Sequence, residues 1–157
     1  MKANAKPIPD GYHTVTPYLI VKDGDRAIEF YKKAFGAKEL FRMDGPDGKI
    51  AHAEIQIGDS RIMIGTESPQ MGSRSPETLK GTPVSIFLYL NDVDAAFKQA
   101  VSAGAKSEQP PQDMFWGDRY GKVADPFGHE WQLATHTEDL TPEEVGKRGK
   151  AAMSQTN

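Results

Sequence analysis

The chain has 157 residues, of which 38% are hydrophobic, and its formal net charge is −3. No stretch is apolar enough to span a membrane, and the N-terminus lacks the apolar segment of a signal peptide. Cysteine is absent, which excludes disulfides, thiolate catalysis and cysteine-based zinc sites and fits a reducing, cytoplasmic location. No basic face favours nucleic acid, so we expect neither a nucleic-acid nor a membrane partner. A small molecule or another protein remains as the expected partner.

The first half of the chain predicts one β-α-β-β-β module over residues 12–66, after a polar arm at 1–11. A strand is expected at about 12–21, because Val, Ile, Tyr and Thr are frequent there. Apolar residues at helical spacing follow, with Asp25 as the predicted N-cap and Gly36 just past the helix end. Three further strands are expected near 38–43, 50–57 and 61–65, separated by glycine-containing turns.

After a polar linker at 67–82, the same order of elements returns over residues 83–137. A strand is predicted at 84–90, then a helix capped by Asn91 or Asp92 and ended by Gly104. The remaining strands are interrupted at Pro110-Pro111 and at the turn over residues 125–128. Two short stretches match between the halves: VKD at 21–23 with LND at 90–92, and GAK at 36–38 with GAK at 104–106. We therefore predict two copies of one module.

The tail, residues 138–157, predicts a further helix. Its start reads TPEE at 141–144, which places threonine at the N-cap, proline at the first helical position and Glu144 at the third. This is the capping-box pattern, and the helix is expected to run to about Met153. Its apolar face is weak, so it is expected to lie on the surface or to reach a partner subunit.

Three segments carry a resemblance to a known family: AIEFYKKAFGA, AEIQIGDSRIMIG and WGDRYGKVADPFGHEWQLATH. Together with the repeated module, over about Val15 to His136, they resemble the vicinal oxygen chelate superfamily of glyoxalases, bleomycin-resistance proteins and dioxygenases. The resemblance implies an α+β fold in which two tandem βαβββ modules form a curved sheet cup with helices outside. It also implies a homodimer.

The resemblance further implies where the metal ligands of the family's enzymes would stand. The aligned positions are Thr16, Met63, Ser85 and Gln132. Only the Gln132 amide is a plausible ligand, because neutral hydroxyls bind such ions weakly and a thioether prefers soft metals. Shifting a strand by two residues, which keeps the same face, recovers no His/Glu set. We therefore expect no metal and no other cofactor.

Alternation along the strands indicates which side chains would face the cup. In the strand at 50–57, Ala51, Ala53, Ile55 and Ile57 form the predicted core face, which leaves His52 and Glu54 on the cup side with Gln56. A histidine and a glutamate two residues apart on a concave surface could bind a ligand or act as acid and base. The alternative is an ordinary solvated sheet face.

The same reasoning in the second module assigns Val84, Ile86, Leu88 and Leu90 to the core, and Phe87 and Tyr89 to the cup. Trp116 and Arg119 lie in the densest aromatic and charged cluster. Arg119 could pair with a ligand carboxylate or with Asp118, and Gln132 would face the cup with Glu130. The alternatives are module or dimer packing for the aromatic side chains and a structural turn for the cluster.

These patterns predict a metal-free protein that binds a small organic, aromatic ligand, as in the drug-sequestering, antibiotic-resistance branch of the family. The predicted ligand-binding residues are His52, Glu54, Phe87, Tyr89, Trp116, Arg119 and Gln132. The alternative is a divalent-metal-dependent glyoxalase-like lyase or isomerase, or a ring-cleaving dioxygenase, which the family permits and the ligand positions oppose. A metal-free enzyme with His52 or Glu54 as the base is a third possibility.

Overall fold

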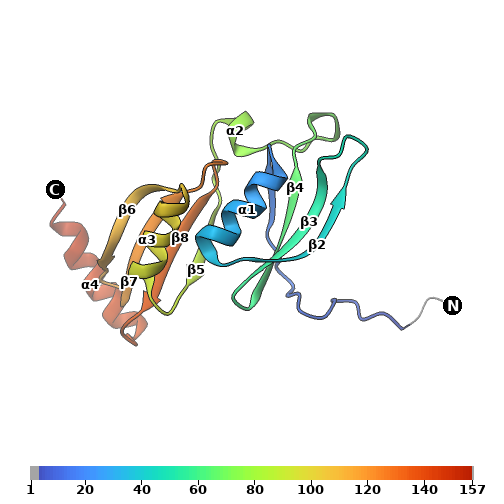
Figure 1. Ribbon diagram of the computed structural model, residues 1–157. Coiled ribbons are helices and arrows are strands. Elements are labelled where there is room, and N and C mark those ends of the chain that lie inside the picture. The colour runs from blue at the N-terminus through green and yellow to red at the C-terminus, as the bar shows by residue number, and fades with distance from the viewer. Residues whose placement is uncertain (1–3, 157) are drawn as a thin grey trace. The chain divides into compact units, whose positions relative to one another are not determined.

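The computed structural model describes residues 4–156 and divides the chain into two compact units, 1–81 and 82–157. Each unit holds one four-stranded sheet with a helix on one face (Figure 1). The element order repeats as strand, helix and three strands, so the predicted α+β fold of two βαβββ modules with an added C-terminal helix is confirmed. None of the helices in residues 4–156 is long and apolar enough to cross a membrane.

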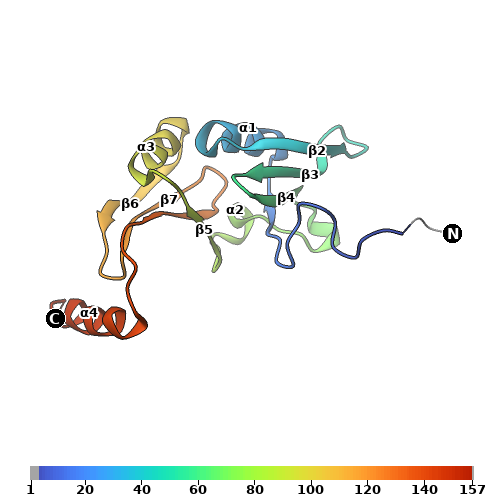
Figure 2. The same ribbon diagram turned by 90° about the horizontal axis from the view of Figure 1, so that it is seen from below.

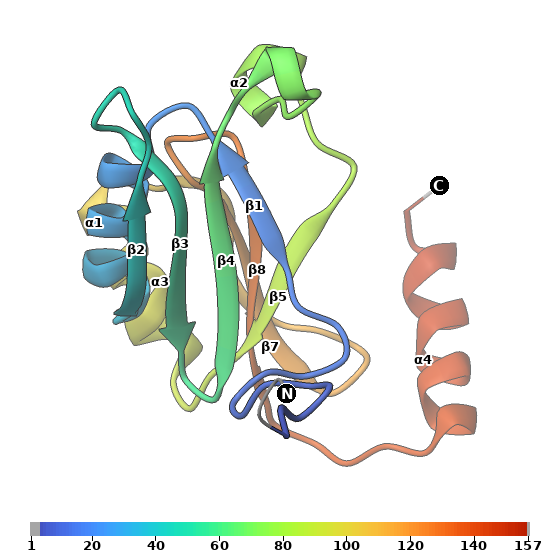
Figure 3. The same cartoon turned by 90° about the vertical axis from the view of Figure 1, so that its right-hand side faces the viewer.

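The first module consists of β1 (Tyr18–Val21), α1 (Gly24–Phe35), β2 (Lys38–Asp44), β3 (Ile50–Ile57) and β4 (Ser60–Thr66). Its strand order is β1-β4-β3-β2 (Figure 3). The first strand runs parallel to β4, with Tyr18 paired to Met63, and the other neighbours are antiparallel. Helix α1 covers one face and buries the core, which includes Val21, Ile28, Tyr31, Ile55 and Ile64. The opposite face is open.

The second module repeats this topology with β5 (Ser85–Tyr89), α3 (Val93–Ala103), β6 (Lys106–Asp113), β7 (Asp118–Ala124) and β8 (Glu130–His136). Its order is β5-β8-β7-β6, and the parallel pair aligns Phe87 with Gln132. Helix α3 packs on β6, β7 and β8 over a core that includes Val93, Val123, Trp131 and Leu133. Trp131 and Leu133 are therefore core residues, as their alternation predicted.

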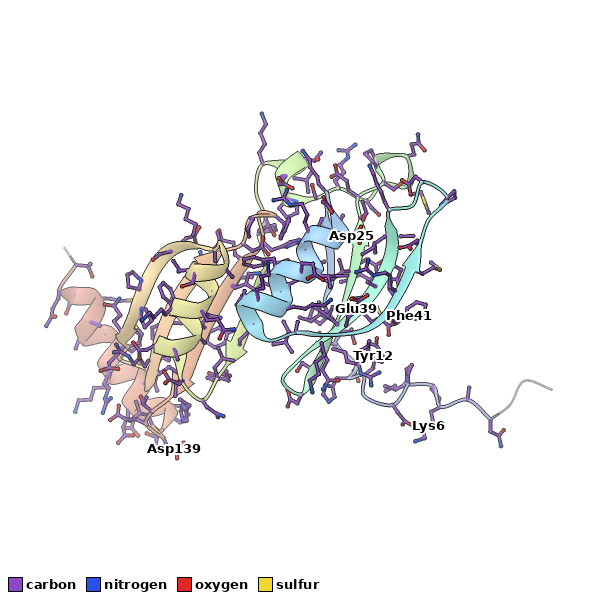
Figure 4. The ribbon with its side chains drawn as sticks, in the orientation of Figure 1. Lys6, Tyr12, Asp25, Glu39, Phe41 and Asp139 are labelled. Atoms are coloured by element: carbon purple, nitrogen blue, oxygen red, sulfur yellow. The ribbon has the colours of Figure 1, made fainter. Side chains whose placement is uncertain are left out.

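Cap residues set the helix boundaries, with one correction. Asp23, not the predicted Asp25, is the N-cap of α1, and its carboxylate accepts a hydrogen bond from the backbone N–H of Arg26 at 3.1 Å. Asp25 instead pairs with Arg42 on β2, which also binds Glu39 (Figure 4). Asp92 caps α3, in agreement with one of the two predicted alternatives.

The strand expected at 12–21 is shorter than predicted. It begins at Tyr18, because the parallel pairing with β4 starts only there and Pro17 contributes a carbonyl without an N–H. Thr16 therefore lies before the strand. In the second module, Val84 likewise falls outside β5 and is exposed, so its assignment to the core was wrong. Ala51 on β3 is also exposed, unlike its predicted core neighbours Ala53 and Ile55.

The segment expected to be a plain linker contains ordered structure. A 3₁₀ turn at Pro69–Met71 and a short helix, α2, at Pro76–Leu79 lie within it. Ser75 is fully buried there, and its backbone N–H donates to the Glu67 carboxylate at 2.8 Å. The Thr78 hydroxyl donates to the same carboxylate, so one glutamate closes this segment on itself.

Helix α4 (Pro142–Ser154) has the predicted capping box, in which the Thr141 hydroxyl accepts from Glu144 N–H and the Glu144 carboxylate accepts from Thr141 N–H. Figure 2 shows α4 on the side of the β5–β8 sheet away from α3. It contacts the module at Gly149, where an added Cβ would lie 3.1 Å from the Phe115 ring. Glycine at this position therefore permits close packing on that ring.

Candidate functional site

The open face of the second module carries a row of aromatic side chains. Ring centroids are 5.0 Å apart for Tyr89 and Phe87, 6.1 Å for Phe87 and Tyr120, and 5.6 Å for Tyr120 and Trp116. Phe87 and Tyr89 are 40% and 66% exposed, because alternation along β5 turns both side chains away from the core. Tyr120 is only 8% exposed, so Tyr89, Phe87 and the partly exposed Trp116 supply the apolar area that a flat ligand could cover.

Asp118 fixes the orientation of two members of this row. Its carboxylate is buried and accepts hydrogen bonds from Trp116 Nε1 at 3.0 Å and from the Tyr89 hydroxyl at 3.2 Å. Burial raises the pKa of Tyr89, and the negative charge of Asp118 raises it further. The Tyr89 phenol therefore stays protonated and remains a donor to Asp118.

Gln132 lies between two hydroxyl groups on the same face. Its side-chain N–H₂ donates to the Ser85 hydroxyl, and its Oε1 accepts from the Tyr120 hydroxyl at 2.8 Å. Burial raises the pKa of Tyr120, which keeps that phenol a donor. Both ends of the amide are thus engaged by strands β5 and β7, and Gln132 is held in a single orientation.

An ion cluster joins strands β6, β7 and β8. Lys122 contacts the carboxylates of Glu108 and Glu130. These contacts raise the pKa of Lys122, and the Lys122 ammonium lowers the pKa of Glu130. All three side chains are about one-third exposed or less, so the cluster is a partly screened local network rather than a free charged patch.

The open face of the first module has a different character. The Tyr18 hydroxyl lies 3.0 Å from His52 Nδ1, and His52 Nε2 lies 3.5 Å from Glu54 Oε1. Phe41 and Met43 on β2 pair with Glu54 and His52 on β3, and both are about half exposed on this face. A chain of three polar groups is thus set among apolar side chains.

The N-terminal arm reaches the edge of this face. The Arg61 guanidinium lies 5.0 Å from the centre of the Tyr12 ring, in a cation–π arrangement. An added Cβ at Gly11 would come within 2.5 Å of the same guanidinium, so the arm packs closely on it. Burial raises the pKa of Tyr12, and nearby Glu54 raises it further. Figure 4 labels Tyr12 where the arm meets the sheet.

The residues at the four metal-ligand positions do not fit a hard divalent cation. Thr16 donates its hydroxyl to the His13 carbonyl, and Ser85 is bound to Gln132. The Gln132 oxygen already accepts from Tyr120, and Met63 offers only a thioether. Within residues 4–156, no group of three His, Asp or Glu side chains is arranged to hold a metal ion.

The seven residues proposed from the sequence fall into three groups. Phe87, Tyr89, Trp116 and Gln132 lie together on the open face of the second module, whereas His52 and Glu54 lie together on that of the first. Arg119 belongs to neither open face. Its guanidinium pairs with Asp94 at the start of α3 and with Asp113, not with Asp118, and these carboxylates raise its pKa.

Sequence reasoning missed three residues that the structure brings to these faces: Tyr18, Asp118 as a buried acceptor, and Tyr120. The alternation of side chains along β7 and β8 could have indicated Tyr120. It is paired with Ala134 on β8, which lies two residues from Gln132 and therefore on the same face of the sheet. Tyr18 gave no signal of its own, because its position depends on the space above Gly65 on a strand far away in the chain.

The chain is similar to known proteins of one superfamily. Residues 12–133 match the model of the Glyoxalase/Bleomycin resistance protein/Dioxygenase superfamily. An uncharacterized protein of Mycobacterium bovis is 46% identical over 143 residues, which cover 89% of this chain and 91% of that protein. An uncharacterized Arabidopsis thaliana protein is 34% identical over 130 residues, covering 78% of this chain and 76% of its own length.

A solved structure shares the fold as well. The crystal structure of TioX from Micromonospora sp. ML1 aligns with a TM-score of 0.64 and 31% sequence identity. The alignment covers 78% of this chain and 97% of TioX.

Proposed function

Because this chain belongs to the Glyoxalase/Bleomycin resistance protein/Dioxygenase superfamily, we propose that it is a small-molecule binding protein that works without a metal. The ligand is an aromatic organic molecule, and its ring packs on the accessible members of the row, Tyr89, Phe87 and Trp116, which the buried Tyr120 supports from within the row. The observation that carries this proposal is the aromatic row on an open sheet face, in which Tyr89 and Phe87 are exposed and the buried carboxylate of Asp118 orients Tyr89 and Trp116.

Physical chemistry favours binding over metal-assisted catalysis on this face. Apolar contact with two or three rings provides most of the affinity for a flat ligand. Asp118 and Gln132 hold their neighbours in fixed orientations before the ligand arrives, which lowers the entropy cost of binding. The hydroxyl, thioether and already bonded amide at the ligand positions oppose a Lewis-acid mechanism.

Titration with a panel of fused-ring aromatic compounds, monitored by tryptophan fluorescence, tests the proposal. Trp116 lies on the open face and Trp131 is fully buried, so quenching by a bound ring comes from Trp116. We expect saturable quenching in the wild type, no quenching with Trp116→Phe, in which only the buried Trp131 emits, and at least about tenfold weaker binding with Phe87→Ala by calorimetry.

Val101→Ala is the matched control. The exposed fraction of Val101 is 39%, similar to the 40% of Phe87, but Val101 lies on α3, on the other side of the same sheet. It should leave the affinity unchanged. If no compound in the panel gives saturable binding, the proposal is wrong. The homodimer implied by the family resemblance and the cytoplasmic location expected from the absence of cysteine belong to the same proposal, and sedimentation equilibrium and cell fractionation test them.

A further inference from the structure

Tyr18 reaches across its own sheet to a histidine two strands away. It stands on β1, and its phenol passes over Gly65 on β4 to meet His52 on β3, with ring centroids 5.5 Å apart. An added Cβ at Gly65 would lie 2.8 Å from the Tyr18 hydroxyl and 3.0 Å from its Cε1. Glycine at position 65 therefore provides the space in which the phenol lies.

The protonation of this chain of groups follows from its acceptors. An ionised Glu54 carboxylate can only accept, so its contact with His52 Nε2 favours the imidazole tautomer with hydrogen on Nε2. In this tautomer of the neutral imidazole, His52 Nδ1 carries a lone pair, and the Tyr18 hydroxyl donates to it. The only hydroxyl hydrogen of Tyr18 is thereby used in the hydrogen bond to His52. The Tyr18 oxygen can therefore interact with a further group only as an acceptor.

The surroundings of Tyr18 make it accessible to an apolar molecule. Tyr18 and Phe41 are 48% and 49% exposed, and Met43 is exposed to a similar degree on the same face. The Phe41 ring lies 6.4 Å from the His52 ring. A flat ligand could thus contact apolar side chains while it meets one oriented hydrogen-bond acceptor.

We infer that the open face of the first module recognises a hydroxyl or N–H donor on an aromatic ligand, through a hydrogen bond to the Tyr18 oxygen. This inference rests on the proposed function only in that the ligand is aromatic. It adds a second binding face, in the first module, that selects a hydrogen-bond donor.

The same arrangement disfavours ligand anions. Glu54 contributes a negative charge to this face beside His52, and a ligand carboxylate would be placed near it. The Arg61 guanidinium, which could attract an anion, lies against the Tyr12 ring and the backbone of Gly11. A neutral donor is therefore the expected partner of Tyr18.

Three naphthalene probes test the inference: 2-naphthol, which can donate, 2-methoxynaphthalene, which cannot, and the anion 2-naphthoate. Binding is followed by the fluorescence anisotropy of the probe. We expect the wild type to bind 2-naphthol about tenfold more tightly than its methyl ether, and 2-naphthoate most weakly.

Tyr18→Phe should lower the affinity for 2-naphthol to that for the ether and leave the ether unchanged. Because the Tyr18 ring lies over Gly65 in the wild type, the phenyl ring of this variant should keep its place and shield His52 Nδ1 from the probe. Gly65→Ala should lower the same ratio while the phenol is retained, because it displaces the ring. Val101→Ala is the matched control: it trims an exposed side chain on α3, outside both proposed faces, and should leave the ratio as it is.

Thermal unfolding and circular dichroism establish that each variant is folded. Equal affinity for 2-naphthol and its ether, a ratio that survives Tyr18→Phe, or a preference for 2-naphthoate would each overturn the inference, while the proposed aromatic binding would stand. If no probe binds, the inference fails, and the panel titration followed through Trp116 decides the proposed function separately.

Discussion

Nδ1 of His136, at the end of β8, lies 2.8 Å from Oδ1 of the buried Asp118. Its other ring nitrogen, Nε2, lies 2.8 Å from Oδ1 of Asp139, in the segment that leads to α4. Ionised carboxylates only accept, so both contacts are hydrogen bonds at the same time only when His136 carries two protons. The contact with Asp118, and next that with Asp139, therefore raises the pKa of His136.

Folding stability should respond to pH through this histidine. Because its pKa is higher in the folded than in the unfolded state, its contribution is complete below the unfolded value and is lost as pH rises through the raised value. We expect the difference in unfolding free energy between the wild type and His136→Gln to shrink from about pH 5.5 to about pH 8.5. Urea unfolding across that range measures it, and a difference that grows with pH would contradict the assignment.

Asp125 should be among the most sensitive positions of the second module. It is 6% exposed, and its carboxylate accepts from the backbone N–H groups of Phe127 and His129 and from Trp131 Nε1, all at 2.9 Å. Asp125→Ala leaves these donors without this acceptor, and we expect a loss of about 3 kcal/mol in unfolding free energy by urea denaturation.

Asp125→Asn is the comparison variant for this site. Its side-chain oxygen can still accept the two backbone hydrogen bonds, but its amide N–H₂ would face the indole N–H. We therefore expect an intermediate loss, of about 1–2 kcal/mol. A loss from Asp125→Asn equal to that from Asp125→Ala would show that the turn does not depend on the two backbone bonds.

Packing of the N-terminal arm should depend on Gly11. Gly11 and Gly48 both have positive φ, of 84° and 76°, but only Gly11 lacks room for a Cβ, which would meet the Arg61 guanidinium. Gly11→Ala and Gly48→Ala share the backbone strain of about 1 kcal/mol, and only the first adds the steric conflict. We expect limited proteolysis to cut the arm faster in Gly11→Ala alone. Equal protection in the two variants would argue against close packing of the arm on Arg61.

Arg119 should prove structural rather than ligand-binding. Its guanidinium donates to Asp94 at 2.6 and 2.9 Å and to Asp113 at 3.2 Å. We expect Arg119→Gln to lower the melting temperature slightly and to leave the affinity for any ligand of the Phe87 face within about twofold. A tenfold loss of affinity without a change in melting temperature would restore Arg119 to the binding site.

The sequence indicated the repeated modules and most strand positions because alternation and turn residues are local signals. The strand at 50–57 was predicted with its observed bounds for that reason. The start of β1 was predicted wrongly because the strand begins where its pairing with β4 begins, at Tyr18 opposite Met63, and β4 is distant in the chain. The N-cap of α1 was misassigned because Asp23 and Asp25 are equally suitable residues, and only the path of the backbone selects Asp23.

The candidate site was predicted less completely, for a related physical reason. Alternation placed Phe87, Tyr89 and Gln132 on an open face, because successive side chains of a strand point to opposite faces of the sheet. It could not indicate which neighbours would meet across strands. The hydrogen bonds of Asp118 to Trp116 and Tyr89, and the passage of Tyr18 over Gly65, depend on strand order and on the space between side chains.

The parallel pairing of each module's first and last strands has a consequence for synthesis on the ribosome. β1 cannot find its place until β4 has emerged, and β5 must wait in the same way for β8. Each sheet is therefore completed by closing a long loop, a slow, non-local step. The two sheets should therefore be completed in two separate steps during synthesis, one after residue 66 and one after residue 136 has left the exit tunnel. Before each step, one edge of β4 or β8 is briefly unpaired.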